Sequence, residues 1–519
     1  IVKNHFSDDL NKSSNGNDKK EWVITDVVPS LNPNVKHVYA QQFYQGIPIQ
    51  YATYKLTIKD GKKVTWTIDQ FVKNIEEKIT NAKSSLSPES AIAAVAGKHG
   101  IAVSSGLQKS SKSVNNVEIL EYKTSGLTLE PIQVSKVFLQ HEGELKLTWK
   151  VSLYPKDGQH WWNANVDAAT GKILYEEDWV ISCDFGTPDH ANHGHNSESV
   201  LMNTSKEDII GPMPALAPDS YNVYAMPVES PIHGGRSIVT NPADATASPF
   251  GWHDTNGSAG AEFTITRGNN VWAQEDRNGN NGTGASPDGG AGLDFNFPLD
   301  LSQQPTSYQN AAVTNLFYWN NIVHDVFYQY GFDEASGNFQ ENNYGRGGAG
   351  SDSVNADAQD GSGTNNANFA TPGDGGNPRM QMFLWNRTSP GRDGDLDNVI
   401  IIHEYGHGIS IRLVGGPSSN NLGGSEQMGE GWSDWFGLML TMKAGDVGTA
   451  GRGVGAYVLG QPADGAGIRP TRYSIDRSIN NTDYADIGGL AVPHGVGYAW
   501  ATILWDMTWA LIDAEGFDP

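Results

Sequence analysis

The segment VIIIHEYGHGIS, residues 399–410, most constrains what this chain can form, because two histidines follow an unbroken apolar run. Such a run predicts a buried helix, and a spacing of four residues places His403 and His407 on one face of it, one turn apart. Two imidazoles so placed can bind one metal ion, and Glu404 lies beside the first of them. The alternative is an ordinary buried helix with two hydrogen-bonded histidines.

A second predicted helix offers a third ligand. In GEGWSDW, residues 429–435, Glu430 and Asp434 are four residues apart and share a helix face. A catalytic zinc ion commonly has three protein ligands and an open fourth position, so we predict Glu430 as the third ligand. Asp434 is placed to accept a hydrogen bond from the outer ring nitrogen of a ligating histidine, which would fix that ring. The alternative, a solvated acidic face, is disfavoured by the aromatic residues beside it.

These residues predict the hydrolysis of a carbonyl compound. Bound zinc lowers the pKa of its water to about 7 and polarises a substrate carbonyl. Glu404 lies next to a ligand but projects differently, so it can take a proton from that water and pass it to the leaving nitrogen. His494 begins the apolar segment HGVGYAWA and is a candidate donor to the oxyanion. It can equally be a structural histidine.

The charge and the type of basic residue change along the chain. Residues 1–180 contain 21 Lys, no Arg and 20 acidic residues, whereas residues 181–519 contain 14 basic residues, mostly Arg, and 39 acidic ones. A chain of 519 residues is expected to form two or three domains, and we place a boundary in the polar stretch 183–219. The net charge of −24 argues against nucleic acid and anionic membranes as partners.

The sequence also bears on cellular location. No apolar stretch approaches the roughly 18–20 residues that span a bilayer. The chain starts without a charged and then apolar leader, so we expect that a signal peptide has been removed. Cys183 is the single cysteine, which excludes an intramolecular disulfide and says little about compartment.

Periodicity predicts a mixture of strands and helices. Alternation predicts strands over 21–73, and Ser87 followed by Pro88 predicts a short helix over 87–101. Strand-like runs continue to about residue 180, and residues 241–310 are rich in Gly and Asn, as loops are. Four longer helices are then predicted at 310–332, 397–415 (Asp397 as N-cap, Gly415 as stop), 426–442 and 493–514.

Two short segments have the alternating oxygen ligands that calcium loops favour. They are DRNGNNG, residues 276–282, and RDGDLDN, residues 392–398. Neither has the glycine and distal glutamate of a complete EF-hand loop, and Asp397 already has a role as a helix cap. A Ca²⁺ ion remains a possible second cofactor beside one catalytic Zn²⁺.

Longer segments carry a family resemblance. They are HEYGHGISIRLVGGP, MGEGWSDW, NNIVHDVFYQYGFDEASGNFQENNYGRGG, NADAQDGSGTNNANFATPGDG and PRMQMFLW. Together they resemble the fungalysin family of secreted zinc metalloendopeptidases, a relative of thermolysin, over about 219–514. YAQQFYQGIPIQYATYKLTIKDGK resembles the propeptide domain of fungalysins and thermolysins, and residues 85–180 resemble the small domain that commonly follows it.

The resemblance implies further roles. The three predicted zinc ligands keep the roles given above, and so do Glu404 and Asp434. His494 is implied as the oxyanion stabiliser. Asn366 and Ala367 resemble the edge segment that pairs with the substrate backbone in this clan, and Arg469 resembles a substrate-orienting arginine. Fungalysins continue beyond the helix that would carry His494, so we expect that a C-terminal part is missing here.

We predict an α+β proenzyme. Its expected parts are a propeptide domain (1–80), a second small α+β propeptide domain (81–182), a linker with the processing site (183–219) and a catalytic domain (220–519). The catalytic domain is expected to be a thermolysin-like two-lobed zincin, with a strand-rich upper lobe and a helical lower lobe.

The predicted function is that of a secreted, extracellular, monomeric zinc endopeptidase. It acts on proteins and peptides and is inhibited by its own propeptide, without nucleic acid or membrane partners. The alternatives are a zinc aminopeptidase, for which we identify no anchor for a substrate amine, and a non-catalytic binding or inhibitory protein on a metalloprotease scaffold.

Overall fold

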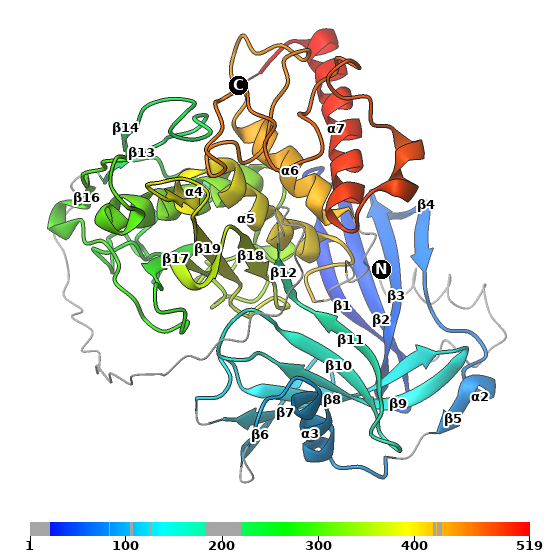
Figure 1. The fold of residues 1–519 in the computed structure, drawn as a ribbon. Helices are drawn as coiled ribbons and strands as arrows, with labels where there is room; N and C mark the ends of the chain where they lie inside the picture. The colour runs from blue at the N-terminus through cyan, green and yellow to red at the C-terminus, as the bar shows by residue number, and fades with distance from the viewer. Residues whose placement is uncertain are drawn as a thin grey trace.

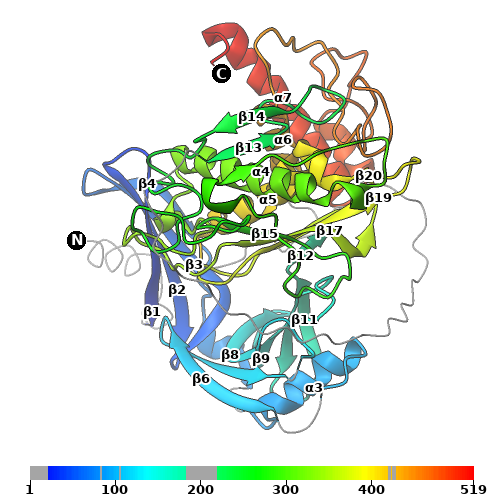
Figure 2. The same ribbon diagram turned by 90° about the vertical axis from the view of Figure 1, so that its left-hand side faces the viewer.

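The computed structural model describes residues 21–81, 84–103, 107–124, 126–182, 219–418, 422 and 428–518. Figures 1 and 2 show two parts, a strand-rich N-terminal region and a C-terminal region in which long helices lie against a second sheet. The structure is therefore of mixed α+β type. The predicted linker and its processing site lie outside the described residues, apart from Asp219.

The N-terminal region is built on one sheet whose strands follow the order β1-β2-β3-β8-β9-β10-β11. Its elements are β1 (Trp22–Pro29), β2 (Val35–Tyr44), β3 (Ile47–Lys59), β4 (Lys62–Asp69), α2 (Ile75–Lys78), β5 (Ile79–Asn81), α3 (Pro88–Lys98), β6 (Gln108–Val114), β7 (Val117–Lys123), β8 (Ile132–His141), β9 (Glu144–Leu153), β10 (Trp162–Asp167), β11 (Ile173–Asp178) and β12 (Val180–Ser182).

Local sequence accounts for much of this region. The Ser87 side chain caps α3 by accepting from the Ser90 amide, with Pro88 at the first helical position, as predicted. Two hydrophobic cores support the sheet: one lies under β2, β3 and Phe71, and the other lies between α3 and β8 to β10. A single register pair, Ile49 with Phe138, joins β3 to β8 where these two halves meet.

The C-terminal region holds a sheet in the order β12-β18-β19-β17-β15 and a smaller one in the order β14-β13-β16. Its strands are β13 (Ser220–Val223), β14 (Ser237–Thr240), β15 (Val271–Glu275), β16 (Asp294–Phe295), β17 (Val354–Thr364), β18 (Ala367–Ala370), β19 (Arg379–Trp385) and β20 (Arg392–Asp393). Its 3-10 turns are η1 (Gly290–Gly292), η2 (Pro305–Ser307), η3 (Glu334–Ser336), η4 (Gly394–Leu396) and η5 (Tyr484–Gly489). Strand β12 comes from the N-terminal region and completes the larger sheet.

Four α-helices cover this part, and sequence predicted each of them. They are α4 (Gln309–Gln329), α5 (Asn398–Leu413), α6 (Gly429–Leu440) and α7 (His494–Glu515). Asp397 occupies the N-cap position of α5, and Gly415, with φ of +92°, follows its end. The main core joins α4 and α5 to the sheet, and a second core joins α6 to α7. None of the helices in the described ranges has the length and apolarity to cross a bilayer.

Candidate metal centre

Helices α5 and α6 bring the three predicted ligands together. The Nε2 atoms of His403 and His407 lie 3.1 Å apart, one helical turn from each other. Glu430 of α6 faces both rings, with its Oε2 3.3 Å from His403 Nε2 and its Oε1 3.8 Å from His407 Nε2. The three residues are buried, and their ligand atoms lie within 4.8 Å of one another, which suits a metal ion.

Two of the three residues, His407 and Glu430, have protonation preferences that fit this donor set. Burial lowers the pKa of His407 to about 3, which keeps its imidazole neutral as a ligand must be. Burial would raise the pKa of Glu430, but the neighbouring histidines hold it well below its ordinary value, so Glu430 is a carboxylate. Two imidazole nitrogens and a carboxylate oxygen form a donor set typical of zinc.

A glycine sets the distance between α5 and α6. A Cβ added to Gly406 would lie 2.8 Å from the Ser433 hydroxyl oxygen and 3.0 Å from its Cα. Only a residue without a side chain therefore allows the two helices to approach so closely. Glu404 lies on α5 between the two histidines and is fully buried.

Asp434 contacts His403 from the side away from Glu430. Its Oδ1 accepts from His403 Nδ1 at 2.8 Å, as the sequence predicted. This contact leaves Nε2 of the ring directed at the other two ligands. Burial would lower the pKa of His403, but the hydrogen bonds to Asp434 and Glu430 raise it to about 9.

Arg469 lies behind the ligands and is buried. Its Nε and Nη2 donate to the two oxygens of Asp434 at 2.7 and 2.8 Å, and its Nη2 lies 3.5 Å from Glu430 Oε2. The structure thus places this arginine, predicted from resemblance to orient substrate, in a bidentate ion pair with Asp434. Such a pair fixes the carboxylate plane.

Tyr473 completes this network, and sequence analysis did not single it out. Its hydroxyl donates to Asp434 Oδ2, and its ring is fully buried. It lies 39 residues after Asp434 in a segment of irregular structure, so no helical or strand spacing connects the two.

His494 begins α7 and also lies beside Glu430. Its Nε2 lies 3.4 Å from Glu430 Oε1, and its side chain is 20% exposed. Burial lowers its pKa. The close approach of α7 to α6 depends on Gly497, because an added Cβ would lie 2.7 Å from the Gly431 amide nitrogen. The structure therefore brings His494 to the same group of side chains as the ligands.

Ala367 begins strand β18, and Asn366 directly precedes it. This strand packs on α5, since a Cβ at Gly408 would lie 2.7 Å from the ring of Phe369. The side of β18 away from β19 pairs antiparallel with β12, with Val180 opposite Ala370 and Ser182 opposite Asn368. The Asn366 Nδ2 donates to the Ser182 hydroxyl at 2.8 Å. The N-terminal region thus occupies the edge that was predicted to pair with substrate.

The two segments proposed for calcium have different surroundings. Asp276 comes within 4.8 Å of Asp357 and Asp360, all three buried, but Arg379 forms an ion pair with Asp357. In the second segment, Asp393 accepts from the Asp395 amide and from Gln359, so its carboxylate serves the local turn. Neither arrangement adds support for calcium.

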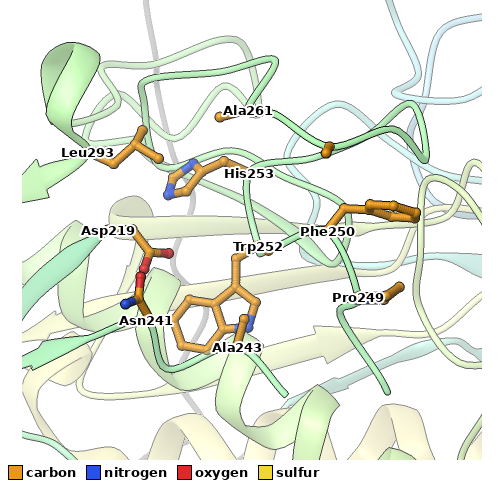
Figure 3. Close-up of a pocket in the computed structure, with 11 residues that line it drawn as sticks. Asp219, Asn241, Ala243, Pro249, Phe250, Trp252, His253, Ala261 and Leu293 are labelled. Atoms are coloured by element: carbon orange, nitrogen blue, oxygen red, sulfur yellow. The ribbon is translucent and has the colours of Figure 1, made fainter. Parts of the chain in front are cut away.

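A cavity of about 270 Å³ lies elsewhere in the C-terminal region. Figure 3 shows side chains that line it, among them Asp219, Asn241, Phe250, Trp252, His253 and Leu293. Burial lowers the pKa of His253 to about 4, so this histidine is neutral. None of the lining residues belongs to the metal centre.

Comparison with known proteins agrees with this geometry. Residues 20–67 match the Fungalysin/Thermolysin Propeptide Motif, and residues 220–519 match the family described as Fungalysin metallopeptidase (M36). Extracellular metalloproteinase 2 of Arthroderma gypseum is 36% identical over 500 residues, which cover 93% of this chain and 71% of that protein. The protein of the same name from Trichophyton tonsurans is 34% identical over 503 residues, with the same coverage.

A third relative extends the match to almost the whole chain. Extracellular metalloproteinase MEP of Pyricularia oryzae is 32% identical over 540 residues, covering 99% of this chain and 78% of that protein. The family match spans strands β13 to β20, the helices α4 to α7 and the buried His-His-Glu group together. The chain belongs to the fungalysin (M36) family of metallopeptidases, and it carries a propeptide motif of the fungalysin and thermolysin type.

Proposed function

We propose that this metallopeptidase is a secreted zinc endopeptidase whose single catalytic ion is bound by His403, His407 and Glu430. The observation that carries this proposal is the buried donor set itself, with His403 fixed by Asp434. Zinc bound there supplies a Lewis acid for the substrate carbonyl and lowers the pKa of a bound water. Secretion is proposed because the relatives are named extracellular metalloproteinases.

Two residues of the chain are proposed to act directly on the substrate. Glu404 is buried on α5 between the ligating histidines, where a carboxylate can accept a proton from water and return it to the leaving nitrogen. His494 has its Nε2 3.4 Å from Glu430, at the start of α7, and partial exposure leaves it accessible to substrate. A donor in that position would stabilise negative charge that develops on the carbonyl oxygen.

The substrate backbone is proposed to add to the edge of β18, beside Asn366 and Ala367. The support is the pairing of β12 with that edge, because a strand of this chain already makes the antiparallel hydrogen bonds that a peptide would make. The inhibitory propeptide thus competes with substrate for one sheet edge. Arg469 is proposed to support the site through Asp434.

We propose two small propeptide domains (1–80 and 81–182), followed by a two-lobed catalytic domain of the thermolysin type. The processing site is proposed in the linker 183–219, and the mature enzyme is proposed to be a monomer. Release of the N-terminal region would uncover β18.

The decisive experiment compares the wild-type chain with Glu404→Gln. Both proteins are expected to bind one zinc ion, because the ligands are unchanged, but only wild type should process itself and cleave casein. A peptide with a blocked N-terminus separates the classes of peptidase, since an endopeptidase cleaves it and an aminopeptidase does not. If the glutamine variant cleaves casein as fast as wild type, the role proposed for Glu404 is wrong.

A further inference from the structure

The hydrogen bonds around Asp434 raise the question of what Tyr473 contributes. An ionised carboxylate offers about four acceptor positions on its two oxygens. In this structure His403 Nδ1, two nitrogens of Arg469 and the Tyr473 hydroxyl donate to Asp434. These four donors use the full acceptor capacity of the carboxylate. Asp434 is buried without solvent contact, so no water replaces a donor that is removed.

The Tyr473 ring is held independently of Asp434. Its backbone exchanges two hydrogen bonds with Arg452, at 2.9 and 2.8 Å, and Arg452 in turn donates to Glu229 at 2.7 Å. The ring also packs against Tyr498 on α7, with centroids 5.4 Å apart. The Tyr473 hydroxyl is therefore held next to Asp434 by contacts that do not involve Asp434 itself.

The same tyrosine connects the two helices that flank the metal centre. Asp434 belongs to α6, whereas Tyr498 lies one turn after His494 in α7. The Tyr498 hydroxyl donates to Asn480 at 2.9 Å, which ties the segment carrying Tyr473 to α7. A shift of Tyr473 would thus affect both the partner of a metal ligand and the helix of His494.

We infer that Tyr473 is a positioning residue of the metal centre, whose hydroxyl holds Asp434 so that His403 presents Nε2 to the metal. This inference rests on the proposed zinc site. Without the hydroxyl, Asp434 Oδ2 keeps only the contact with Arg469 Nε, and the carboxylate can rotate toward the guanidinium. Partners of this kind typically change metal affinity by about 10- to 100-fold when removed.

The test uses the full chain with zinc bound and the variant Tyr473→Phe. A matched control is Tyr221→Phe, because Tyr221 is also fully buried and donates to a carboxylate, Asp219, at 3.0 Å. Zinc transfer to a chromogenic chelator is followed with time, and thermal unfolding is measured on the zinc-free proteins. Tyr473→Phe should release zinc at least about 10-fold faster than wild type, whereas Tyr221→Phe should match wild type.

The outcomes separate the inference from the proposed function. Comparable unfolding midpoints for the two zinc-free variants, with fast zinc release only in Tyr473→Phe, support the positioning role. Zinc release within twofold of wild type overturns it, and so does failure of Tyr473→Phe to fold, which shows a general structural role. A wild-type chain that binds no zinc, or a His403→Ala variant that still binds it fully, refutes the zinc site itself.

Discussion

Replacing Gly497 by alanine tests whether helix packing holds the metal ligands in place. An added Cβ would lie 2.7 Å from the Gly431 amide nitrogen and 3.1 Å from the Glu430 carbonyl carbon, and it would also overlap the Glu430 Cβ. Carbon atoms pack at about 3.5–4.0 Å, so α6 and α7 must separate or Glu430 must move. Glu430 is fully buried, so it has little room to yield.

The expected change in stability is the difference between two effects. Overpacking of a well-packed core costs about 1–3 kcal/mol. Alanine in a helix interior is more favourable than glycine by about 1 kcal/mol. We therefore expect Gly497→Ala to lower the free energy of unfolding by about 0–2 kcal/mol. Zinc affinity should fall more clearly, by at least about 10-fold, because the displaced residue, Glu430, is a proposed ligand.

The assay combines thermal unfolding of the zinc-free chain with zinc transfer to a chelator. The control is Gly97→Ala in α3, where an added Cβ meets no atom within 4 Å. That variant should keep zinc binding unchanged and gain about 0.5–1 kcal/mol of stability. If Gly497→Ala instead behaves like Gly97→Ala in both measurements, the close approach of α6 and α7 does not position Glu430, and the reasoning is refuted.

Two further predictions concern the N-terminal region. Ile181→Pro removes a hydrogen-bond donor from β12, which pairs with β18, so residual peptidase activity of an uncleaved precursor should rise about 5- to 150-fold, corresponding to about 1–3 kcal/mol. Ile181→Ala keeps the backbone donor, so the activity of its precursor should stay near that of wild type. Equal activities of the Ile181→Pro and wild-type precursors in a fluorogenic peptide assay would contradict this account. Asp26 accepts a hydrogen bond from Ser418 across the interface, and burial raises the pKa of its carboxyl above the ordinary 3.8. Docking of the N-terminal region should therefore weaken as pH rises from below 3.8 through this raised pKa. The measurement is binding of the separated N-terminal region at pH 4 to 8. Asp26→Asn should flatten the pH dependence of this binding, whereas Asp60→Asn, at an exposed position, should not. An unchanged slope in Asp26→Asn would exclude the Asp26 carboxyl as the source of the pH dependence.

Helical spacing explains why the group of His403, His407 and Glu430 proposed to bind zinc could be anticipated from sequence. His403 and His407 lie one turn apart on one helix, and Glu430 and Asp434 lie one turn apart on another. Within each helix the period fixes which side chains share a face, whatever the rest of the fold does. The start of α3 at Ser87 was predictable for the same reason, because a cap depends on a few neighbouring residues.

Tyr473 and β12 could not be predicted in this way. Tyr473 reaches Asp434 from an irregular segment that is placed by pairing with Arg452, and no local period records that pairing. Strand β12 pairs with β18 within one sheet, although nearly 190 residues separate the two strands in sequence, so no local period records their pairing. The ion pair of Arg469 with Asp434 was likewise absent from the sequence prediction, because 35 residues and no common period separate the two side chains.

The proposed substrate edge of β18 would link inhibition and catalysis through one physical property. A sheet edge presents backbone donors and acceptors that need a partner, and an extended peptide provides one. In this chain β12 supplies the partner over Ala370 to Asn368, and the Asn366 side chain extends the contact to Ser182. An edge that binds peptide substrates must be uncovered in the mature enzyme, so the strand that covers it has to be removed. Maturation and activation would then be the same event, because cleavage after β12 allows the N-terminal region to leave the edge that substrate requires.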